Sequence, residues 1–430
     1  MINCFIPFLS LPQARQTVRA LGLCDRIKNI YLLATEKIPD EVEGCEMLMI
    51  DSPASTATFR TIALHADTAY TLLYTKYTAF EPGQFAFERL LAIAGDTNAG
   101  MLYADRYLLK NGNSQQAPVI DYQKGSLRDD FDFGSLLFFR SSVLKQAVRA
   151  MDADYRFAGL YDLRLRVSEL AELVHVNEYL YSEVETDIRK SGEKLFDYVD
   201  PKNRAVQIEM EAVCTAYLKR VGGYLAPDFE PVTFDAGGFE QEASVIIPVR
   251  NRIRTIEDAI CSVLAQKTTF RFNLIIVDNH STDGTSEAIG KYTADGRVVH
   301  LVPERSDLGI GGCWNVGVHH PACGKFAVQL DSDDVYSGPD TLQKIVDAFY
   351  EQNCAMVVGT YRMTDFKMNE IPPGIIDHRE WTLENGRNNA LRINGLGAPR
   401  AFYTPVLRRI NLPNTSYGED YALGLRISRT

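Results

Sequence analysis

The chain has 430 residues, with 56 acidic and 45 basic side chains and a formal net charge of −11. This acidic balance argues against a nucleic-acid partner and against a polybasic membrane contact. No apolar run reaches the length of a transmembrane helix, and residues 1–12 lack the pattern of a signal peptide. The eight cysteines show no Cys-x-x-Cys spacing, which predicts reduced thiols and a cytoplasmic location.

The N-terminal half contains apolar runs that predict strands at residues 2–7, 70–74 and 173–181. Between them lie glycine-led segments at 134–144 and 159–168. The length of the chain accommodates two domains of about 200 residues, each large enough to bury its own core.

The middle of the chain predicts a connecting helix. Residues 201–221 carry their apolar side chains on one helical stripe, and the stripe ends at Gly222-Gly223. An irregular segment with two prolines follows to residue 241. The predicted organisation is therefore an N-terminal domain at 1–200, a helical linker at 201–242 and a C-terminal domain at 243–430.

Strands and helices alternate in the C-terminal half. Predicted strands lie at 243–249, 272–277, 298–302 and 326–330, with helices after the first, second and third of them. Continuous apolar strands that alternate with helices indicate an α/β fold with a mostly parallel sheet. Ligands bind at the carboxyl ends of such strands. Asn251, Asp278 and Asp331 all fall at this edge, which predicts one shared pocket.

Three carboxylates, Asp331, Asp333 and Asp334, lie within four residues after the last predicted strand. Like charges this close repel one another and raise each pKa unless a cation is present. A hard divalent metal that also grips substrate phosphates is the usual answer. An Asp-rich turn that caps the helix near Asp340 is the alternative. An EF-hand loop is excluded, because Tyr336 stands where that loop requires glycine.

Four motifs, in this order, are together similar to glycosyltransferase family 2. They are Ser-Val-Ile-Ile-Pro-Val-Arg-Asn at 244–251, Val-Asp-Asn-His-Ser-Thr-Asp-Gly-Thr at 277–285, Asp331-x-Asp333-Asp334, and Gly418-Glu419-Asp420. The resemblance covers roughly residues 243–430 and implies the GT-A fold and an inverting mechanism.

The resemblance implies a nucleoside site for a nucleotide-diphospho-sugar donor. Its residues would be Pro248, Val249, Arg250, Asn251, Asp278 and Asn279. The family often has an aromatic residue where Arg250 stands and a second Asp where Asn279 stands. An Asn amide both donates and accepts hydrogen bonds, so the identity of the nucleoside base is left undecided. A UDP-sugar is the donor we expect.

The resemblance also implies the chemistry. Asp331, with Ser332 beside it, would contact the donor's ribose or the metal shell. Asp333 and Asp334 would hold Mn2+ or Mg2+ at the diphosphate. Asp420 would be the general base that takes the proton from the acceptor hydroxyl, and its neighbour Glu419 would orient the acceptor. The alternative for this pair is a favourable charge pair at a helix N-terminus.

The N-terminal half reads as a degenerate copy of the C-terminal half. Residues 70–80 parallel 326–336, but Thr75, Lys76, Tyr77 and Thr78 replace the carboxylates. We therefore predict that the first copy binds no catalytic metal and that Asp162, near its base position, is structural. The first copy continues into the strand at 173–181, whereas the second ends at Thr430. The family commonly has a further strand there, so the second copy is predicted to be truncated.

The predicted function is metal-dependent, inverting transfer of a sugar to a hydroxyl of a glycan or lipid-linked acceptor in cell-surface polysaccharide synthesis. Peripheral association with the inner membrane face is compatible with this function. The alternative is a non-catalytic scaffold that binds a nucleotide-sugar or a glycan. A sugar-phosphate nucleotidyltransferase and a Rossmann dehydrogenase are disfavoured, because no glycine-rich signature follows the strand at 243–249.

Overall fold

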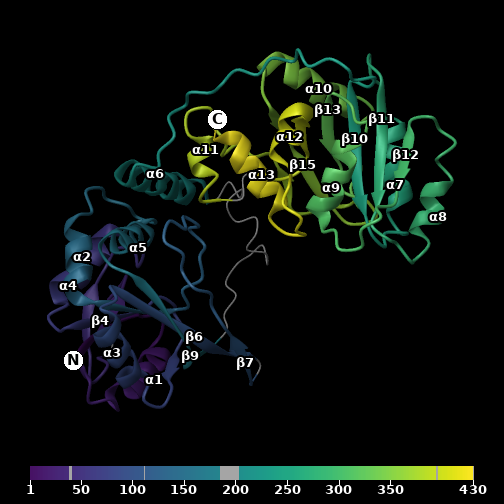
Figure 1. Ribbon diagram of the computed structural model, residues 1–430. Coiled ribbons are helices and arrows are strands. Elements are labelled where there is room, and N and C mark those ends of the chain that lie inside the picture. The colour runs from purple at the N-terminus through teal and green to yellow at the C-terminus, as the bar shows by residue number, and fades with distance from the viewer. Residues whose placement is uncertain (38–40, 111, 185–202, 394–395, 430) are drawn as a thin grey trace. The chain divides into compact units, whose positions relative to one another are not determined.

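The computed structural model describes residues 1–37, 41–110, 112–184, 203–393 and 396–429 (Figure 1). The chain divides into two compact units, Met1–Tyr224 and Leu225–Thr430. This division falls inside the segment predicted as the linker, while the predicted boundary at residue 200 lies outside the described residues. Each unit is built around its own sheet, which is mostly parallel in the C-terminal unit and mixed parallel and antiparallel in the N-terminal unit. This architecture confirms the predicted α/β fold class.

The sheet of the C-terminal unit has the strand order β12-β11-β10-β13-β17-β14. These strands and the β15–β16 hairpin are β10 (Ala243–Val249), β11 (Phe272–Asp278), β12 (Val298–Leu301), β13 (Phe326–Gln329), β14 (Met356–Val358), β15 (Tyr361–Thr364), β16 (Glu370–Ile376) and β17 (Arg400–Tyr403). The helices are α7 (Ile256–Leu264), α8 (Thr285–Gly290), α9 (Ile310–His319), α10 (Thr341–Gln352), α11 (Gly386–Asn389), α12 (Thr404–Ile410) and α13 (Glu419–Ser428).

Both faces of this sheet are covered, which explains why its strands are apolar at consecutive positions. Val245 and Ile247 on β10 belong to one core cluster with residues of α7, α8 and α10. Ile246, between them, belongs to a second cluster with residues of α9, α12 and α13. The alternation of side chains along a strand sends neighbouring residues to opposite faces.

The strand register brings the predicted motifs to one edge. Val249 pairs with Asp278 across the parallel β10 and β11, and Ile246 pairs with Gln329 across the parallel β10 and β13. Three strands therefore end side by side, and the turns that follow them share the carboxyl edge of the sheet. This arrangement brings Asn251, Asp278 and Asp331 to the edge of the sheet expected from the sequence.

The N-terminal unit repeats the same order with more strands. Its sheet runs β3-β2-β1-β4-β8-β6-β9-β5, and β7 pairs with β6. The strands are β1 (Ile2–Pro7), β2 (Ile27–Ala34), β3 (Glu46–Met49), β4 (Tyr70–Tyr74), β5 (Phe80–Pro82), β6 (Met101–Lys110), β7 (Asn113–Ala117), β8 (Leu136–Arg140) and β9 (Leu173–Val184). The helices are α1 (Leu11–Gly22), α2 (Thr56–His65), α3 (Ala86–Thr97), α4 (Ser141–Arg149), α5 (Gly159–Leu170) and α6 (Arg204–Val221).

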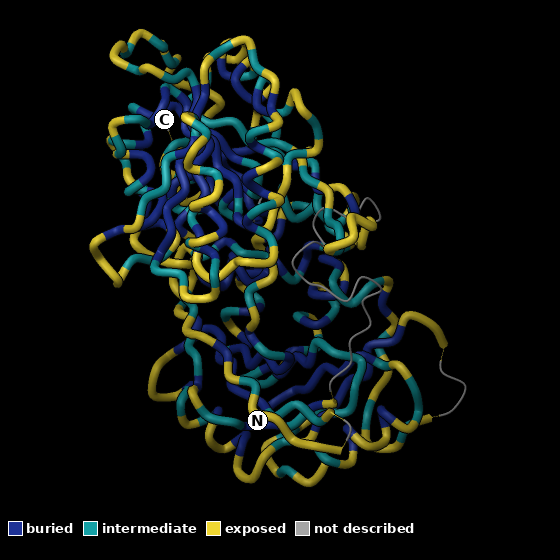
Figure 2. Tube along the Cα trace, turned by 90° about the vertical axis from the view of Figure 1, so that its right-hand side faces the viewer, coloured by how far each residue is buried: buried dark blue, intermediate teal, exposed yellow. Residues whose placement is uncertain are grey.

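Six strands of the N-terminal sheet, in the order β3-β2-β1-β4-β8-β6, correspond one by one to the strands β12-β11-β10-β13-β17-β14 of the C-terminal sheet. In both sheets the first four strands pair in parallel, and the fifth is antiparallel to the fourth. This agreement supports the predicted repeat. Figure 2 shows the buried strands at the centre of each unit.

The predicted connecting helix is α6, which lies in the N-terminal unit and packs on α5. Among the helices that the structure describes, none combines the length and apolar character needed to cross a membrane.

Candidate functional site

A cavity of about 350 Å³ opens at the carboxyl edge of the C-terminal sheet. The residues that line it come from the turns after β10, β11 and β13, from the start of α9, from β17 and from the start of α13. They are Pro248, Val249, Arg250, Arg252, Asn279, Leu308, Ile310, Cys313, Gln329, Asp331, Ser332, Asp333, Arg400, Ser416, Glu419 and Asp420. The structure thus brings most of the sequence-predicted site residues together, whereas Asn251, Asp278 and Asp334 are not among the lining residues.

Asn251 joins two loops. Its backbone adopts the left-handed conformation with φ of 55°, which Asn tolerates better than most residues. Its Oδ1 accepts from the Thr282 backbone N–H at 2.8 Å, and its own N–H donates to Ser281 Oγ at 2.9 Å. Because its side chain is used in these contacts, Asn251 shapes the rim of the cavity by holding the β10 and β11 loops together.

Asp278 is fully buried at the end of β11 and holds the turn that follows. Its carboxylate accepts from the Ser281 backbone N–H at 3.0 Å and from the Ser286 hydroxyl. His300 Nε2 lies 3.5 Å away. Burial opposes ionisation of Asp278, but these hydrogen bonds outweigh it and hold its pKa below the ordinary value.

Replacing Asp278 by Asn is expected to lower the free energy of unfolding by about 2–3 kcal/mol at pH 7, because a buried, hydrogen-bonded charge is lost. The pKa of Asp278 is lower in the folded state than in the unfolded state. The contribution of its carboxylate to the free energy of unfolding is therefore complete at pH values above the unfolded-state pKa. It is lost as pH falls through the folded pKa, and the difference between variant and wild type is expected to shrink below about pH 4.

Tryptophan fluorescence during urea unfolding measures this effect in the C-terminal unit alone, because both tryptophans, Trp314 and Trp381, lie there. The exposed Asp347, replaced by Asn, is the matched control. A difference between Asp278→Asn and wild type that stays constant from pH 7 to pH 3 would contradict the assigned pKa shift.

Asn279 presents a hydrogen-bond acceptor at the cavity. Its Nδ2 donates to the Leu308 carbonyl oxygen at 2.8 Å, which fixes the orientation of the amide. Its Oδ1 is buried without a hydrogen-bond partner among the described residues. An amide held in this way offers an oxygen, as a carboxylate would.

Glycines at the start of α9 allow the chain before α13 to come close. A Cβ on Gly311 would lie 2.0 Å from the Pro413 carbonyl oxygen, and one on Gly312 would lie 2.2 Å from Asn414 Oδ1. The Gly311 N–H also donates to the Thr415 carbonyl at 3.0 Å. A side chain at either glycine would clash with residues 413–414. The glycines therefore allow Ser416 and the first residues of α13 to reach the cavity.

The carboxylate turn after β13 places Asp331 and Asp333 at the cavity. Burial, opposed by Arg400 and reinforced by the charges of Asp333 and Asp420, raises the pKa of Asp331. The side chain of Asp333 is 51% exposed, and its Oδ2 lies 3.9 Å from Arg252 Nε. Asp334 is exposed on the same turn.

The donor set of this turn fits a hard divalent cation. Carboxylate oxygens suit Mg2+ and Mn2+, and Mg2+ is commonly held by one or two carboxylates together with substrate phosphates. Among the described residues, no group of three or more His, Cys, Asp or Glu side chains is arranged to hold a metal by itself.

The start of α13 places two more carboxylates at the cavity. Glu419 is 6% exposed, and its Oε2 has no hydrogen-bond partner among the described residues. Burial and the charges of Asp420 and Asp331 raise its pKa, although a backbone hydrogen bond and Arg400 oppose this. Asp420 is partly exposed, and its Oδ1 accepts from the Tyr421 backbone N–H at 2.6 Å.

Arg400 links these carboxylates, and the sequence reasoning missed it. Its Nη1 lies 2.6 Å from Asp420 Oδ2. Its Nε donates to Gln329 Oε1 at 2.6 Å and its Nη1 to the Leu396 carbonyl at 2.9 Å. Arg400 is 6% exposed, so it supplies buried positive charge where Asp331 and Asp420 meet. The signal in the sequence that could have pointed to Arg400 is the cluster of carboxylates itself, because clustered negative charges require a positive counter-charge nearby.

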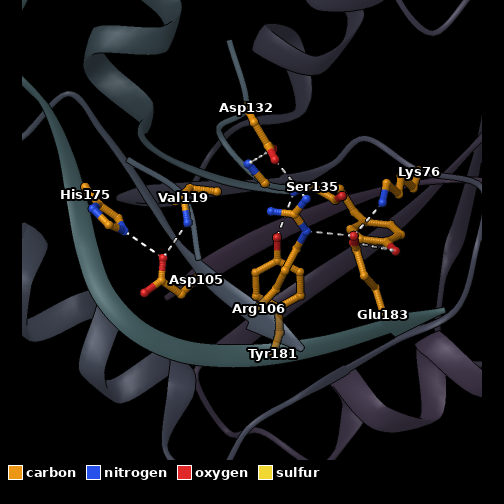
Figure 3. A network of polar contacts seen from close by, with 11 residues as sticks. Lys76, Asp105, Arg106, Val119, Asp132, Ser135, His175, Tyr181 and Glu183 are labelled. Carbon is orange, nitrogen blue, oxygen red and sulfur yellow. Dashed lines mark hydrogen bonds and ion pairs between the residues drawn. The ribbon is translucent and has the colours of Figure 1, made fainter. Parts of the chain in front are cut away.

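The corresponding turn of the N-terminal unit has a different chemistry (Figure 3). Lys76 forms an ion pair with the fully buried Glu183, which also pairs with Arg106 Nε at 3.0 Å. Arg106 in turn contacts Asp132 at 3.0 Å. An ammonium group thus lies where the C-terminal unit has its carboxylate turn. The predicted structural role of Asp162 is consistent with its ion pair to Arg166 at 3.0 Å.

Residues 244–409 match the family model described as "Glycosyl transferase family 2". TuaG of Bacillus subtilis, named as a glycosyltransferase of teichuronic acid biosynthesis, is 33% identical over 120 residues, which are 28% of this chain and 46% of TuaG. An uncharacterized glycosyltransferase of Rickettsia conorii is 38% identical over 97 residues, 23% of this chain and 15% of that protein. The chain thus spans less than half the length of these curated relatives. The crystal structure of Staphylococcus aureus TarS 1–349 is 21% identical, with a TM-score of 0.33, and the likeness covers 42% of this chain and 53% of that one.

Proposed function

Since residues 244–409 form a glycosyltransferase family 2 domain, we propose that the C-terminal unit transfers a sugar from a nucleotide-diphospho-sugar to an acceptor hydroxyl with inversion. The observation that carries this proposal is the gathering of Asp331, Asp333 and Asp420 around one cavity. Asp331 and Asp333 come from one motif and Asp420 from another, and together they would serve two roles that glycosyl transfer requires.

The donor's diphosphate is proposed to lie against the turn after β13. Asp333 and Asp331 would hold the divalent cation there, with Asp334 beside them on the same turn. The cation, when bound, supplies positive charge that stabilises the departing nucleoside diphosphate. Arg250 and Arg252 line the same cavity, and their guanidinium groups suit phosphate oxygens.

The nucleoside is proposed to lie between Pro248, Val249 and Asn279. The Asn279 amide offers its oxygen because its Nδ2 is bound to Leu308, so it suits a base that presents an N–H group. Uracil and guanine both have such a group, and a UDP-linked donor remains our proposal.

The acceptor hydroxyl is proposed to lose its proton to Asp420. The buried Glu419 would position the acceptor, because its unpartnered Oε2 adds a hydrogen-bond acceptor at the same wall. Glycans and lipid-linked sugars both present hydroxyls of this kind, and transfer to such an acceptor in cell-surface polysaccharide synthesis is part of the proposal. TuaG is named for a comparable pathway.

Calorimetric titration of UDP and GDP into the full chain, with and without Mn2+, tests the donor site. One nucleotide is expected to bind more tightly with Mn2+. Asp333→Ala is expected to weaken that binding by about tenfold or more and to abolish its dependence on the metal. Asp347→Ala, an exposed carboxylate on α10 of the same unit, is the matched control and is expected to bind as wild type does.

The outcomes separate the alternatives. Nucleotide or glycan binding without any sugar transfer would favour the scaffold function over the enzyme. Binding that ignores both Mn2+ and Asp333→Ala would refute the proposed role of the carboxylate turn.

A further inference from the structure

The N-terminal unit contains a cavity of about 380 Å³, in the size range of small-ligand pockets. It is lined by Ala54, Thr75, Met101, Asp129, Asp130, Phe131, Asp132, Phe133, Gly134, Leu137, Phe139, Phe157, Leu160, Tyr161, Arg164 and Met210. Thr75 follows β4 as Asp331 follows β13, and Leu160 and Tyr161 begin α5 as Glu419 and Asp420 begin α13. The cavity therefore occupies the same place in this unit as the donor cavity does in the other.

The charges of this cavity disfavour a diphosphate. Three of its lining residues are acidic (Asp129, Asp130 and Asp132), and one, Arg164, is basic. Arg164 is buried, and its guanidinium donates to the Ser126 and Arg128 carbonyl oxygens at 3.3 and 3.0 Å. Asp130 and Asp132 are ion-paired with Arg128 and Arg106 at 2.9 and 3.0 Å. The basic lining residue, Arg164, is committed to the backbone, so it adds little attraction for an anionic ligand.

Aromatic rings form one wall and are held in place. The centroids of Phe131 and Phe133 lie 4.4 Å apart, and Tyr122 packs behind them at 5.7 Å from each. The Arg164 guanidinium lies over Phe133 at 5.4 Å and over Tyr161 at 4.8 Å from the ring centroids. Rings fixed in this way lose little freedom when a ligand packs on them.

A carboxylate lies beside the aromatic wall. Asp132 Oδ1 accepts from the Gly134 N–H at 2.8 Å, and its Oδ2 contacts Arg106 (Figure 3). Its side chain remains 49% exposed. A ligand hydroxyl that donates to this carboxylate would meet a group whose position the protein already fixes.

We propose that this cavity binds an uncharged sugar residue of a glycan chain. A sugar ring presents C–H faces that pack on aromatic rings and hydroxyl groups that donate to carboxylates. Both features are present in the cavity, and the commitment of Arg164 to the backbone disfavours phosphorylated donors and acidic sugars. The site is separate from the proposed transferase site and needs neither nucleotide nor metal.

The test is glycan binding by the full chain without nucleotide or metal. Probes are an array of bacterial surface glycans, followed by calorimetry with the array hits and with maltohexaose, cellohexaose and chitohexaose. Phe131→Ala is expected to weaken the Kd by about tenfold, as loss of an aromatic anchor does. Leu160→Trp, which fills the cavity instead of emptying it, is expected to abolish binding.

Two variants serve as controls. Tyr107→Ala removes a ring on β6 that packs against Tyr179, with the ring centroids 4.8 Å apart, and that lies outside the cavity lining. Asp333→Ala disables the proposed donor site of the other unit. Both are expected to bind the glycan as wild type does, and thermal unfolding confirms that each variant folds.

Three results would overturn the proposal. They are no binding to any glycan on the array or in the calorimeter, binding that survives both Phe131→Ala and Leu160→Trp, and binding that Asp333→Ala removes. Each can occur whether or not the C-terminal unit transfers a sugar, so the two proposals fail independently.

Discussion

Replacing Asp420 by Asn is expected to lower the rate of sugar transfer by about 10²–10⁴-fold, the contribution of a positioned general base. The Asn side chain has nearly the same shape, and its amide oxygen can still accept from Arg400, which lies 2.6 Å from the carboxylate in the wild type. Donor binding is therefore expected to change little. The measurement is release of nucleoside diphosphate from the donor that titration identifies, with a glycan acceptor present.

A helix-terminus role for Asp420 predicts a different result. In that case the variant loses about 0.3–1 kcal/mol of stability through the helix dipole and keeps its transfer rate. Asp258, in the first turn of α7, is the matched control, since Asp258→Asn removes a first-turn carboxylate outside the cavity. Equal transfer rates for Asp420→Asn and Asp258→Asn would refute the assignment of the general base.

Replacing Arg400 by Met is expected to lower the free energy of unfolding of the C-terminal unit by about 2–4 kcal/mol. The substitution removes the partner of Asp420 and the donor to Gln329 and leaves Asp331 without its nearby positive charge. The expected loss is below that of a fully buried pair, because the Asp420 side chain is 29% exposed. Urea unfolding followed by tryptophan fluorescence measures it.

Arg305→Met is the matched control for this prediction. Arg305 forms an ion pair with Asp307 at 2.7 Å, but both side chains are 66% exposed. Such exposed pairs are screened by solvent and contribute little to stability. If Arg400→Met and Arg305→Met destabilise the unit equally, Arg400 is not the buried counter-charge of the site.

Strands β1, β4, β10, β11 and β13 could be predicted because burial on two faces leaves a continuous apolar run in the sequence. Residues 243–249 were predicted as a strand and form β10 with the same bounds. The carboxyl edge followed from this prediction, since polar residues after parallel strands meet at one edge of the sheet. Asp331 and its neighbour Asp333 could therefore be placed at this edge without a structure, whereas Asp420 was assigned to the site only through the family resemblance.

The use of each polar side chain could not be predicted in the same way. Asn251 and Asp278 follow strands as Asn279 does, yet they close loops while Asn279 lines the cavity. The sequence shows a residue at a strand end but does not show which loop atoms lie within hydrogen-bond distance of it.

The sequence by itself determined the two α/β units, the absence of carboxylates at Thr75–Thr78 and the family motifs of the C-terminal unit, because these depend on local patterns of burial and charge. Only the tertiary structure decided that Arg400 counters the carboxylates and that the first unit keeps an aromatic cavity at the matching edge. Both depend on residues far apart in the chain whose contacts arise when the sheet and its helices pack together.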